Sequence, residues 1–316
     1  MTESLPLVSI CVPTYNSAGY LRESLDSILR QTYPNMEIIV ADNASTDGTL
    51  TILREYEERQ QVRVLTNEIN CGAAANFNRL IEAAKGELVA IYHSDDVYEP
   101  TIVQESVKPF LAEQAVGLVG TMGHVMDAAG IRQFTYGLPR WIKKQHSSNL
   151  DFDDMLRGMV TSSGTRTLII TPTIMVRKSV YNEFGLFDDK QYKSSGDYEM
   201  WLRVCRKHAF TIIEQPLINY RIHPQQGSEQ ELRRNLKVGD IFKVIEEYAH
   251  FTTSQQLKRL CRRFLDEQLL RAALRQNNAG LFDESKQTLE QCRAWDHWGA
   301  KGLLRLANAC QFRIRR

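Results

Sequence analysis

Short apolar runs alternate with helix-like patterns along the first 110 residues of the chain. The apolar runs, which are predicted to be strands, span residues 7–12, 36–41, 62–66 and 88–92. Between them, apolar residues such as Leu21, Leu25 and Ile28 recur every three or four positions, which is typical of one face of a helix. Strands that alternate with helices in this way predict an α/β domain with right-handed crossovers and a Rossmann-like, mostly parallel central sheet.

The pattern changes in the second half of the chain. Residues 116–122 predict a further strand that turns into a hairpin with 132–136, and residues 210–213 and 217–222 predict two more. The apolar run 167–176 contains Pro172, so we expect an edge strand or a bent strand there. Beyond Gly227 the periodicity is purely helical. We therefore predict two domains, an α/β domain over residues 1–226 and a helical C-terminal appendage over residues 227–316.

Polar, turn-forming residues follow each of the first four predicted strands, at 13–16, 42–48, 67–72 and 93–96. The carboxyl ends of parallel strands meet at one edge of a sheet, which is where open α/β sheets bind their ligands. We therefore expect a single binding site built from these four segments.

Two adjacent carboxylates, Asp95 and Asp96, follow closely on the predicted buried strand 88–92. Oxygen ligands in this position suit a hard divalent cation, which usually brings a phosphate with it. The alternative is that the two acids only cap the helix that follows. Asp42 also lies at a strand end, where it can accept hydrogen bonds from a base or a ribose, whereas Asp47 is predicted to start the next helix.

Amide side chains near the third strand end are candidates for a ligand contact. Asn70 and Gly72 have an alternative explanation in a tight turn, and Asn76, on the first turn of the next helix, can point its amide into the same cleft. The chain has no GxGxxG after the first strand and no GxxxxGK[ST], which disfavours a dinucleotide-dependent dehydrogenase and a P-loop enzyme.

Composition narrows the class of protein. The 39 Lys and Arg residues nearly balance the 38 Asp and Glu residues, so no nucleic-acid partner is expected. The six cysteines include no close pair, and Cys11 lies in an apolar strand as a reduced cysteine would, which favours the cytosol. The N-terminus does not resemble a signal peptide, and no run approaches the roughly 18 apolar residues of a membrane span. We predict a cytoplasmic protein, either free or peripheral on the inner face of a membrane.

Six motifs follow one another along the first 225 or so residues. They are Pro13-Thr-Tyr-Asn16, Asp42-Asn-Ala-Ser-Thr-Asp-Gly-Thr49, Asn70-Cys-Gly72 with Asn76, Asp95-Asp96, Gly196-Asp197-Tyr-Glu-Met-Trp201, and Tyr220-Arg-Ile-His223. This order is typical of family 2 glycosyltransferases, which this part of the chain resembles. The resemblance implies the GT-A fold, a nucleotide-diphosphate sugar as donor and an inverting transfer to an acceptor hydroxyl.

The resemblance also implies roles for individual residues. Pro13, Tyr15, Asn16 and Asp42 match the base and ribose pocket, and Asp95 matches an acid that faces the ribose. Asp96 matches the metal ligand on the diphosphate, and His223 matches a histidine that some relatives use as a second ligand. With these ligands we expect Mn²⁺ or Mg²⁺ rather than Ca²⁺. Asp197 matches the catalytic base.

Two residues depart from the family pattern. The glutamate that usually precedes the base is Gly196 here, and the second aspartate of the first acidic turn is Asn43. Asp197 and Asp42 are therefore expected to act without these neighbours. The alternatives for Asp197 and His223 are an N-cap and an ordinary loop histidine.

The sequence thus favours a hexosyltransferase that uses a UDP-sugar in the assembly of a polysaccharide or glycoconjugate, with a carbohydrate or lipid-linked acceptor. One alternative is a nucleotidyltransferase, which is disfavoured because residues 13–19 contain no Lys or Arg for a triphosphate. The other is a catalytically silent sugar-nucleotide-binding protein, which Gly196 leaves open.

The tail, residues 291–316, mixes aromatic and aliphatic residues with basic ones. Such a helix suits an anionic membrane surface. The alternative is a helix that packs on the catalytic domain with a solvated basic end. The polar segment 137–148 is expected to face the acceptor.

Overall fold

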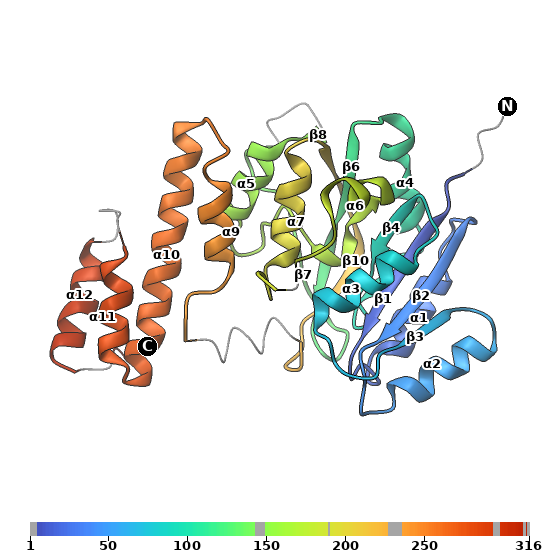
Figure 1. Cartoon of the computed structure of the whole chain (residues 1–316), viewed down its shortest axis with the longest axis horizontal. Coiled ribbons are helices and arrows are strands. Elements are labelled where there is room, and N and C mark those ends of the chain that lie inside the picture. The colour runs from blue at the N-terminus through green and yellow to red at the C-terminus, as the bar shows by residue number, and fades with distance from the viewer. Residues whose placement is uncertain are drawn as a thin grey trace. The chain divides into compact units, whose positions relative to one another are not determined.

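The chain divides into two compact units, Met1–His223 and Pro224–Arg316. The computed structural model describes residues 5–142, 149–188, 190–226, 236–292, 298–311 and 314. In this part of the chain every strand belongs to the first unit, whereas the second consists of helices (Figure 1). The division falls at His223, near the predicted boundary at residue 226.

One sheet forms the centre of the first unit. Its strands are β1 (Val8–Thr14), β2 (Met36–Asp42), β3 (Arg63–Thr66), β4 (Leu88–Ile91), β5 (Val97–Tyr98), β6 (Val116–Met126), β7 (Arg132–Thr135), β8 (Asn149–Leu150), β9 (Met175–Arg177) and β10 (Ala209–Arg221). The main path runs β3-β2-β1-β4-β9-β6-β10-β5, while β7 pairs with β6 and β8 with β10. The long pairings β1–β2, β1–β4, β2–β3 and β6–β10 are parallel, which confirms the predicted, mostly parallel α/β fold.

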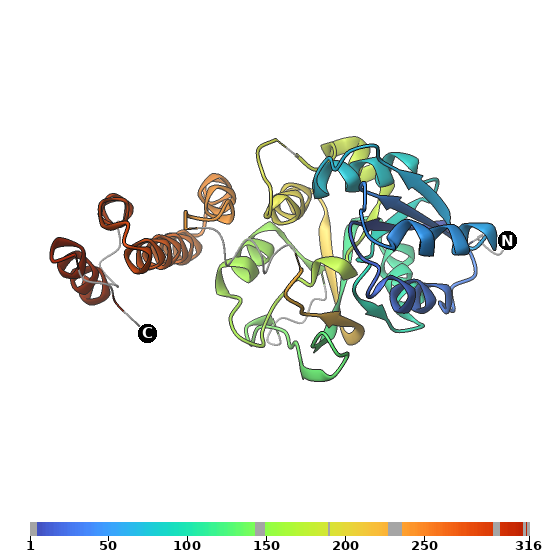
Figure 2. The same cartoon turned by 90° about the horizontal axis from the view of Figure 1, so that it is seen from below.

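Helices pack on both faces of this sheet, as Figure 2 shows. The helices of the first unit are α1 (Leu21–Leu29), α2 (Thr49–Glu58), α3 (Ala73–Ala83), α4 (Ile102–Ala112), α5 (Phe152–Thr161), α6 (Lys178–Phe184) and α7 (Gly196–Cys205). α3 packs on β1 and β2, whereas α4 packs on β6 and β10. Because both faces are covered, central strands such as β4 are buried along their whole length, as their uninterrupted apolar sequence predicts.

The prediction of an edge strand or a bent strand over 167–176 is wrong, because only the end of this run, from Met175, belongs to a strand. Thr171–Thr173 form a short 3₁₀ turn that contains Pro172, and the strand β9 begins only after it. β9 pairs antiparallel with both β4 and β6, so it lies inside the sheet. Pro172 has no N–H to donate. It is tolerated because it lies in the turn and not in the strand, so no hydrogen bond between strands is lost.

The last strand in the sequence also differs from the prediction. The two strands predicted at 210–213 and 217–222 form one long strand, β10, whose register with β6 shifts around Pro216. The two-residue strand β5, which the pattern does not predict, follows Asp96 and pairs antiparallel with Ile218 and Asn219. β10 therefore ends next to the acidic pair.

The second unit has a core and a polar network of its own. Its helices are α9 (Ile241–Tyr248), α10 (Gln255–Ala279), α11 (Phe282–Glu290) and α12 (Trp298–Ala309). Gly280, at a φ of 84°, makes the turn between α10 and α11. Ala273, Leu289 and Leu304 form the apolar centre, and the buried Asn277 and Asn308 side chains share a hydrogen bond of 2.8 Å. None of the helices within the described ranges combines the length and the apolar composition needed to cross a bilayer.

Candidate active site

Hydrogen bonds join the loops that follow β1, β2, β3 and β4, which confirms that the polar strand ends share one edge of the sheet. Asn16 Oδ1 accepts from Thr46 N at 2.8 Å, and Asn43 Nδ2 donates to Asn70 Oδ1 at 3.0 Å. The hydroxyls of Ser17 and Ser94 lie 2.8 Å apart. Side chains separated by up to 77 positions in the sequence therefore form one continuous edge.

The predicted motif at residues 13–16 ends in a constrained turn. Pro13 lies in β1, and the Tyr15 side chain is 50% exposed. Asn16 has a φ of 50°, a left-handed conformation that asparagine tolerates, and its N–H donates to Ser45 Oγ at 2.9 Å. Asn16 thus joins two loops, while Tyr15 leaves an aromatic ring accessible beside them.

Asp42 is buried at the end of β2, and its carboxylate is already hydrogen-bonded. Oδ2 accepts from Ser45 N at 2.9 Å, and Oδ1 accepts from Ser45 Oγ at 2.5 Å. Thr14 Oγ1 lies 3.3 Å from Oδ1. In this state the carboxylate shapes its own turn, and a contact with a base requires Ser45 or Asp42 to rearrange.

Asn43, which occupies the position of the expected second aspartate, is the centre of an amide network. Its Oδ1 accepts from Asn67 Nδ2 at 2.9 Å and from Cys71 N at 3.0 Å, and its Nδ2 donates to Asn70 Oδ1 and to Gly72 O. A carboxylate could make the first two contacts and not the last two, since it has no donor. The departure from the family pattern therefore has a structural reason.

The predicted amide contacts at Asn70 and Asn76 belong to the same network. Asn76 is buried, donates from Nδ2 to Ala41 O at 3.0 Å and accepts from Asn67 Nδ2 at 3.0 Å. Asn70 is exposed, and its Oδ1 accepts from Gly72 N at 2.9 Å. Gly72 has a φ of 86°, which the turn into α3 requires. Asn70 can reach a ligand directly, whereas Asn76 supports the loop.

The acidic pair lies at the end of β4 together with a histidine. His93, Asp95 and Asp96 each offer one ligand atom, and these atoms all lie within 4.8 Å of one another. Asp96 is fully buried, and its Oδ1 accepts from Arg221 N at 2.8 Å. Among the described residues, neither Asp96 Oδ2 nor His93 Nε2 has a hydrogen-bond partner, although both atoms are buried. Buried polar atoms rarely stay unpaired, so these two suit a ligand.

Burial and charge shift the pKa values of these groups in different directions. Burial, reinforced by the charge of Asp95, raises the pKa of Asp96 well above its usual value. Burial also acts to raise the pKa of Asp95, but its hydrogen bond with His223 and the two nearby imidazoles leave that pKa lowered. Burial lowers the pKa of His93, which favours the neutral imidazole that ligates metals. The cluster thus offers one carboxylate, one acid that a cation would ionise and one neutral nitrogen.

His223 lies against Asp95. Its Nε2 is 3.0 Å from Asp95 Oδ2, and its ring centre is 4.7 Å from that of Tyr20. The structure therefore brings His223 to the acidic pair, and His93 is the histidine that completes the three-donor group. The sequence pattern gave no sign of His93, because β4 ends at Ile91 and residues 94–95 form a turn, so strand alternation does not relate His93 to Asp95.

Asp197 lies within the first turn of α7 and is not its N-cap, which is Ser195. Its Oδ2 accepts from Thr171 Oγ1 at 2.7 Å, and its Oδ1 accepts from Tyr198 N at 2.8 Å. The sequence analysis also missed Thr171, which lies in the 3₁₀ turn where a strand is predicted. Both hydrogen bonds stabilise the ionised carboxylate on a rigid element.

Aromatic rings connect α7 to the end of β4. Trp201 is buried and packs edge-on against Phe187 with ring centres 5.9 Å apart. Phe187 packs on Phe77 at 5.7 Å, and Phe77 stacks with His93 at 6.2 Å. The helix that carries Asp197 is therefore packed, through these rings, against the group of His93, Asp95 and Asp96.

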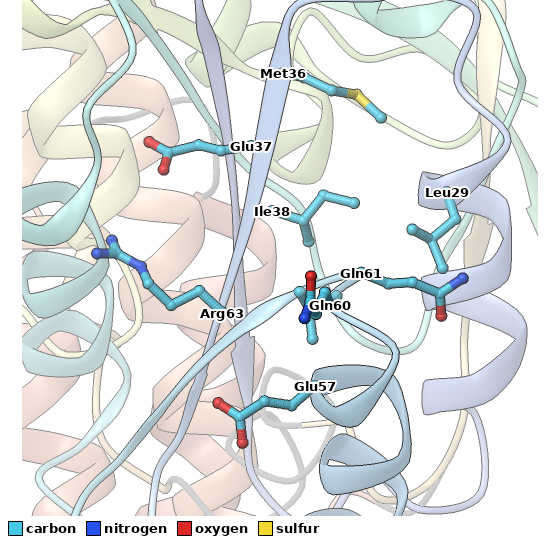
Figure 3. A pocket seen from close by; sticks show the side chains of 9 residues that line it. Leu29, Met36, Glu37, Ile38, Glu57, Gln60, Gln61 and Arg63 are labelled. Carbon is cyan, nitrogen blue, oxygen red and sulfur yellow. The ribbon is translucent and has the colours of Figure 1, made fainter.

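A groove of about 540 Å³ lies away from these residues, at the opposite edge of the sheet (Figure 3). It is lined by the end of α1, the start of β2 and the segment from Gln60 to Arg63. None of the predicted site residues contributes to its wall. Of the segment expected to face an acceptor, residues 143–148 lie outside the described part of the chain.

Comparison with known proteins identifies the family. The sequence profile of glycosyl transferase family 2 matches residues 9–183, which is more than half of the chain. The chain therefore belongs to glycosyl transferase family 2, and it is a glycosyltransferase with a GT-A fold.

Among curated relatives, the putative teichuronic acid biosynthesis glycosyltransferase TuaG of Bacillus subtilis is 29% identical over 254 residues, which cover 79% of this chain and 92% of TuaG. The chain spans only 36% of the length of another relative, an uncharacterized glycosyltransferase of Rickettsia felis.

Two solved structures share the fold. Staphylococcus aureus TarS residues 1–349, in complex with UDP-GlcNAc, superposes with a TM-score of 0.62 at 20% identity over 96% of this chain and 87% of that one. The mannosyltransferase PcManGT of Pyrobaculum calidifontis, in complex with GDP-Man and Mn²⁺, superposes with a TM-score of 0.59 at 18% identity over 98% and 81% of the two chains. At these identities the likeness establishes the fold.

Proposed function

We propose that this protein is an inverting glycosyltransferase that moves a hexose from a nucleotide-diphosphate donor, a UDP-sugar, to an acceptor hydroxyl. The observation that carries this proposal is the group of His93, Asp95 and Asp96 at the carboxyl end of β4, with two buried ligand atoms that no described residue satisfies. Family membership and the UDP-GlcNAc complex of the structurally similar TarS support the donor class.

We further propose that this group binds one divalent cation, Mn²⁺ or Mg²⁺. Two carboxylates and one neutral imidazole form a mixed oxygen and nitrogen donor set that fits these ions, and PcManGT binds Mn²⁺. Asp96 and His93 are the proposed ligands, and Asp95 is placed to serve either the cation or the ribose. His223 would orient Asp95 through their hydrogen bond. When bound, the cation neutralises the charge that develops on the diphosphate leaving group.

The nucleotide would lie along the loops after β1, β2 and β3. Tyr15 offers its exposed ring to a base, and Asn70 offers its exposed amide. Asp42, Asn16 and Asn76 keep the proposed pocket in shape through the hydrogen bonds described above, and Pro13 sets the direction of the chain as it leaves β1.

Asp197 is the proposed catalytic base. The acceptor oxygen forms a bond to the anomeric carbon while the bond from that carbon to the diphosphate oxygen breaks, and the hydroxyl proton passes to Asp197. An aspartate is sufficient because the proton leaves late, when the acceptor oxygen has become acidic. Thr171 and Tyr198 hold the carboxylate in a fixed orientation for this transfer.

Asp197→Asn tests the proposed function. The wild type is incubated with Mn²⁺ and a panel of UDP- and GDP-sugars, and the released nucleotide and the transferred sugar are both measured. We expect Asp197→Asn to retain donor binding and to lose transfer by about 10²–10⁴-fold. Asp283→Asn, which changes an exposed aspartate in the first turn of α11, is the matched control.

The outcomes separate the alternative functions. A nucleotidyltransferase would consume a nucleoside triphosphate and a sugar phosphate and release pyrophosphate. A sugar-nucleotide-binding protein would bind donor without transfer, and wild type and Asp197→Asn would then behave alike. Either result would overturn the proposed function.

The acceptor is proposed to be a carbohydrate or a lipid-linked carbohydrate of polysaccharide assembly, as the name of TuaG suggests for that relative. The predicted membrane contact through residues 291–316 has one supporting feature in the described part of α12. Leu303 and Leu306 are 61% and 67% exposed and lie three positions apart, so they share a face. α12 carries Lys301 and Arg305 and no acidic residue, which suits an anionic bilayer surface.

Sedimentation with phosphatidylglycerol vesicles tests this contact. The double variant Leu303→Ser/Leu306→Ser is expected to lose vesicle binding, while Leu111→Ser, which changes an exposed leucine of α4, is expected to retain it. Equal sedimentation of all three proteins, or none by the wild type, would contradict a membrane contact through α12. Trp295, Phe312, Arg313, Arg315 and Arg316, which belong to the same prediction, lie outside the described residues.

A further inference from the structure

Arg221 is a buried arginine next to the acidic pair, and although it belongs to the motif Tyr220-Arg-Ile-His223, the proposed function assigns it no role. It is the last residue of β10 and is 2% exposed. Its Nε donates to the carbonyl oxygen of Asp95 at 2.8 Å, and its Nη2 donates to the Glu23 carboxylate of α1. Its guanidinium carbon lies 4.6 Å from the centre of the Tyr20 ring.

Burying a guanidinium costs free energy unless its donors are paired. The partners of Arg221 therefore show which segments it connects. Glu23 balances its charge, Tyr20 covers its flat face, and Ala128 O lies 3.5 Å from Nη1. The remaining contact, to Asp95 O, fixes the peptide between the two acids. Arg221 therefore connects three segments, namely α1, the β6–β7 turn and the loop after β4.

The backbone of Arg221 holds the second acid as well. Its N–H donates to Asp96 Oδ1 at 2.8 Å, and Asp96 Oδ2 is the oxygen that has no partner among the described residues. The side chain thus fixes the main chain at Asp95, while the main chain fixes the carboxylate of Asp96. The ion pair of the guanidinium is with Glu23.

We propose that Arg221 is a positioning residue that holds the Asp95–Asp96 peptide so that Asp96 Oδ2 is presented to the divalent cation; this inference rests on the proposed function. Some residues orient a metal ligand through a hydrogen bond and do not contact the metal themselves. Replacing such a residue typically lowers metal affinity by about 10–100-fold. Lysine cannot substitute, because a single ammonium cannot reach Asp95 O and Glu23 in the fixed geometry of a guanidinium.

Arg221→Lys and Arg177→Lys form a matched pair for the test. Arg177 also donates to backbone carbonyls, those of Val116 and Phe110, and also lies over an aromatic ring, that of Phe110 at 5.0 Å. It is at the far end of β9 from the acidic pair, so its replacement controls for the loss of a packed, carbonyl-bound guanidinium.

Mn²⁺ affinity is measured on the full chain by electron paramagnetic resonance in the presence of UDP, and thermal unfolding is recorded in the absence of metal. We expect Arg221→Lys to weaken Mn²⁺ binding by about 10–100-fold and Arg177→Lys by less than twofold, even where the two lower the Tm equally. The kcat of Arg221→Lys should recover at saturating Mn²⁺, because the reacting groups are unchanged.

Glu23→Gln keeps the test decisive if Arg221→Lys fails to fold. This variant removes only the charge partner of Arg221, and we expect it to bind Mn²⁺ about two- to fivefold more weakly. The control is Glu55→Gln, which breaks the exposed Arg22–Glu55 pair at the same helix. It should have no effect on Mn²⁺ binding. Equal Mn²⁺ affinity in the wild type and the Arg221 or Glu23 variant would overturn this inference alone. Absence of UDP-dependent Mn²⁺ binding in the wild type would instead contradict the proposed function.

Discussion

Two neighbouring parts of the same sheet edge differ in whether their polar side chains are hydrogen-bonded. After β2 and β3, the side chains of Asn43, Asn67 and Asn76 bond to one another and to the backbone. After β4, Asp96 Oδ2 and His93 Nε2 are buried and have no partner among the described residues. Satisfied polar groups shape a loop, whereas unsatisfied buried ones are costly and indicate a candidate ligand site. The comparison therefore separates residues that build the site from residues that bind.

Asp96→Asn is expected to have the largest effect on this comparison. Asparagine can keep the bond from Arg221 N but cannot supply the negative oxygen that a cation requires, so we expect kcat/KM to fall by about 10²–10⁴-fold. Steady-state assays with Mn²⁺ measure this fall. An active Asp96→Asn protein would show that the end of β4 is not the metal site.

The same substitution has a defined effect on stability. Burial raises the pKa of Asp96 in the folded protein above its unfolded value, so the folded state retains this proton to a higher pH. The free energy of unfolding then decreases as pH rises from the unfolded pKa through the folded one. We therefore expect metal-free Asp96→Asn to unfold at a higher temperature than wild type at neutral pH, and we expect added Mn²⁺ to stabilise the wild type alone.

Asn43→Asp tests the satisfied side of the comparison. It restores the aspartate typical of the family, but it leaves Asn70 Oδ1 and Gly72 O facing a carboxylate that has no proton to donate. We expect the free energy of unfolding to fall by about 1–3 kcal/mol in urea titrations. Asn35→Asp, at an exposed asparagine that donates to Leu5 O, is the control and should change little. A stable, fully active Asn43→Asp would contradict the structural role of the network.

Thr171→Val is expected to have the smallest effect. It removes the hydroxyl that donates to Asp197 Oδ2 while keeping the volume, so the base loses one of the groups that orient it. We expect kcat to fall about tenfold, with KM for the donor unchanged. Thr165→Val, at an exposed threonine of the preceding loop, should leave kcat unchanged. If KM changes and kcat does not, Thr171 acts on donor binding and not on the base.

The sequence predicted the parallel part of the sheet well and the antiparallel part poorly. Strands such as β4 are buried on both faces, so their uninterrupted apolar runs identify them. β5 and β9 have only two and three residues, and long-range pairing rather than their own sequence defines them. For this reason the apolar run 167–176 did not predict that β9 lies inside the sheet.

The candidate site shows the same limit. The resemblance to a family singled out Asp95, Asp96 and Asp197 from their motifs, but it could not show which oxygens are free. The contacts of His93, Thr171 and Arg221 depend on segments up to 198 positions apart, so they became visible only in the fold. Sequence patterns predict which residues are present at a strand end, and the hydrogen bonds decide what each of them can do.

Titration calorimetry of UDP into the wild-type protein, once with Mn²⁺ and once with a chelator, tests the central claim most directly. The unsatisfied ligand atoms at the end of β4 predict tight, one-to-one binding with Mn²⁺ and binding weakened at least tenfold without it, with the difference abolished in Asp96→Asn. Equal heats with and without the metal, or an Mn²⁺ effect that persists in Asp96→Asn, would contradict the claim that this group binds the cation.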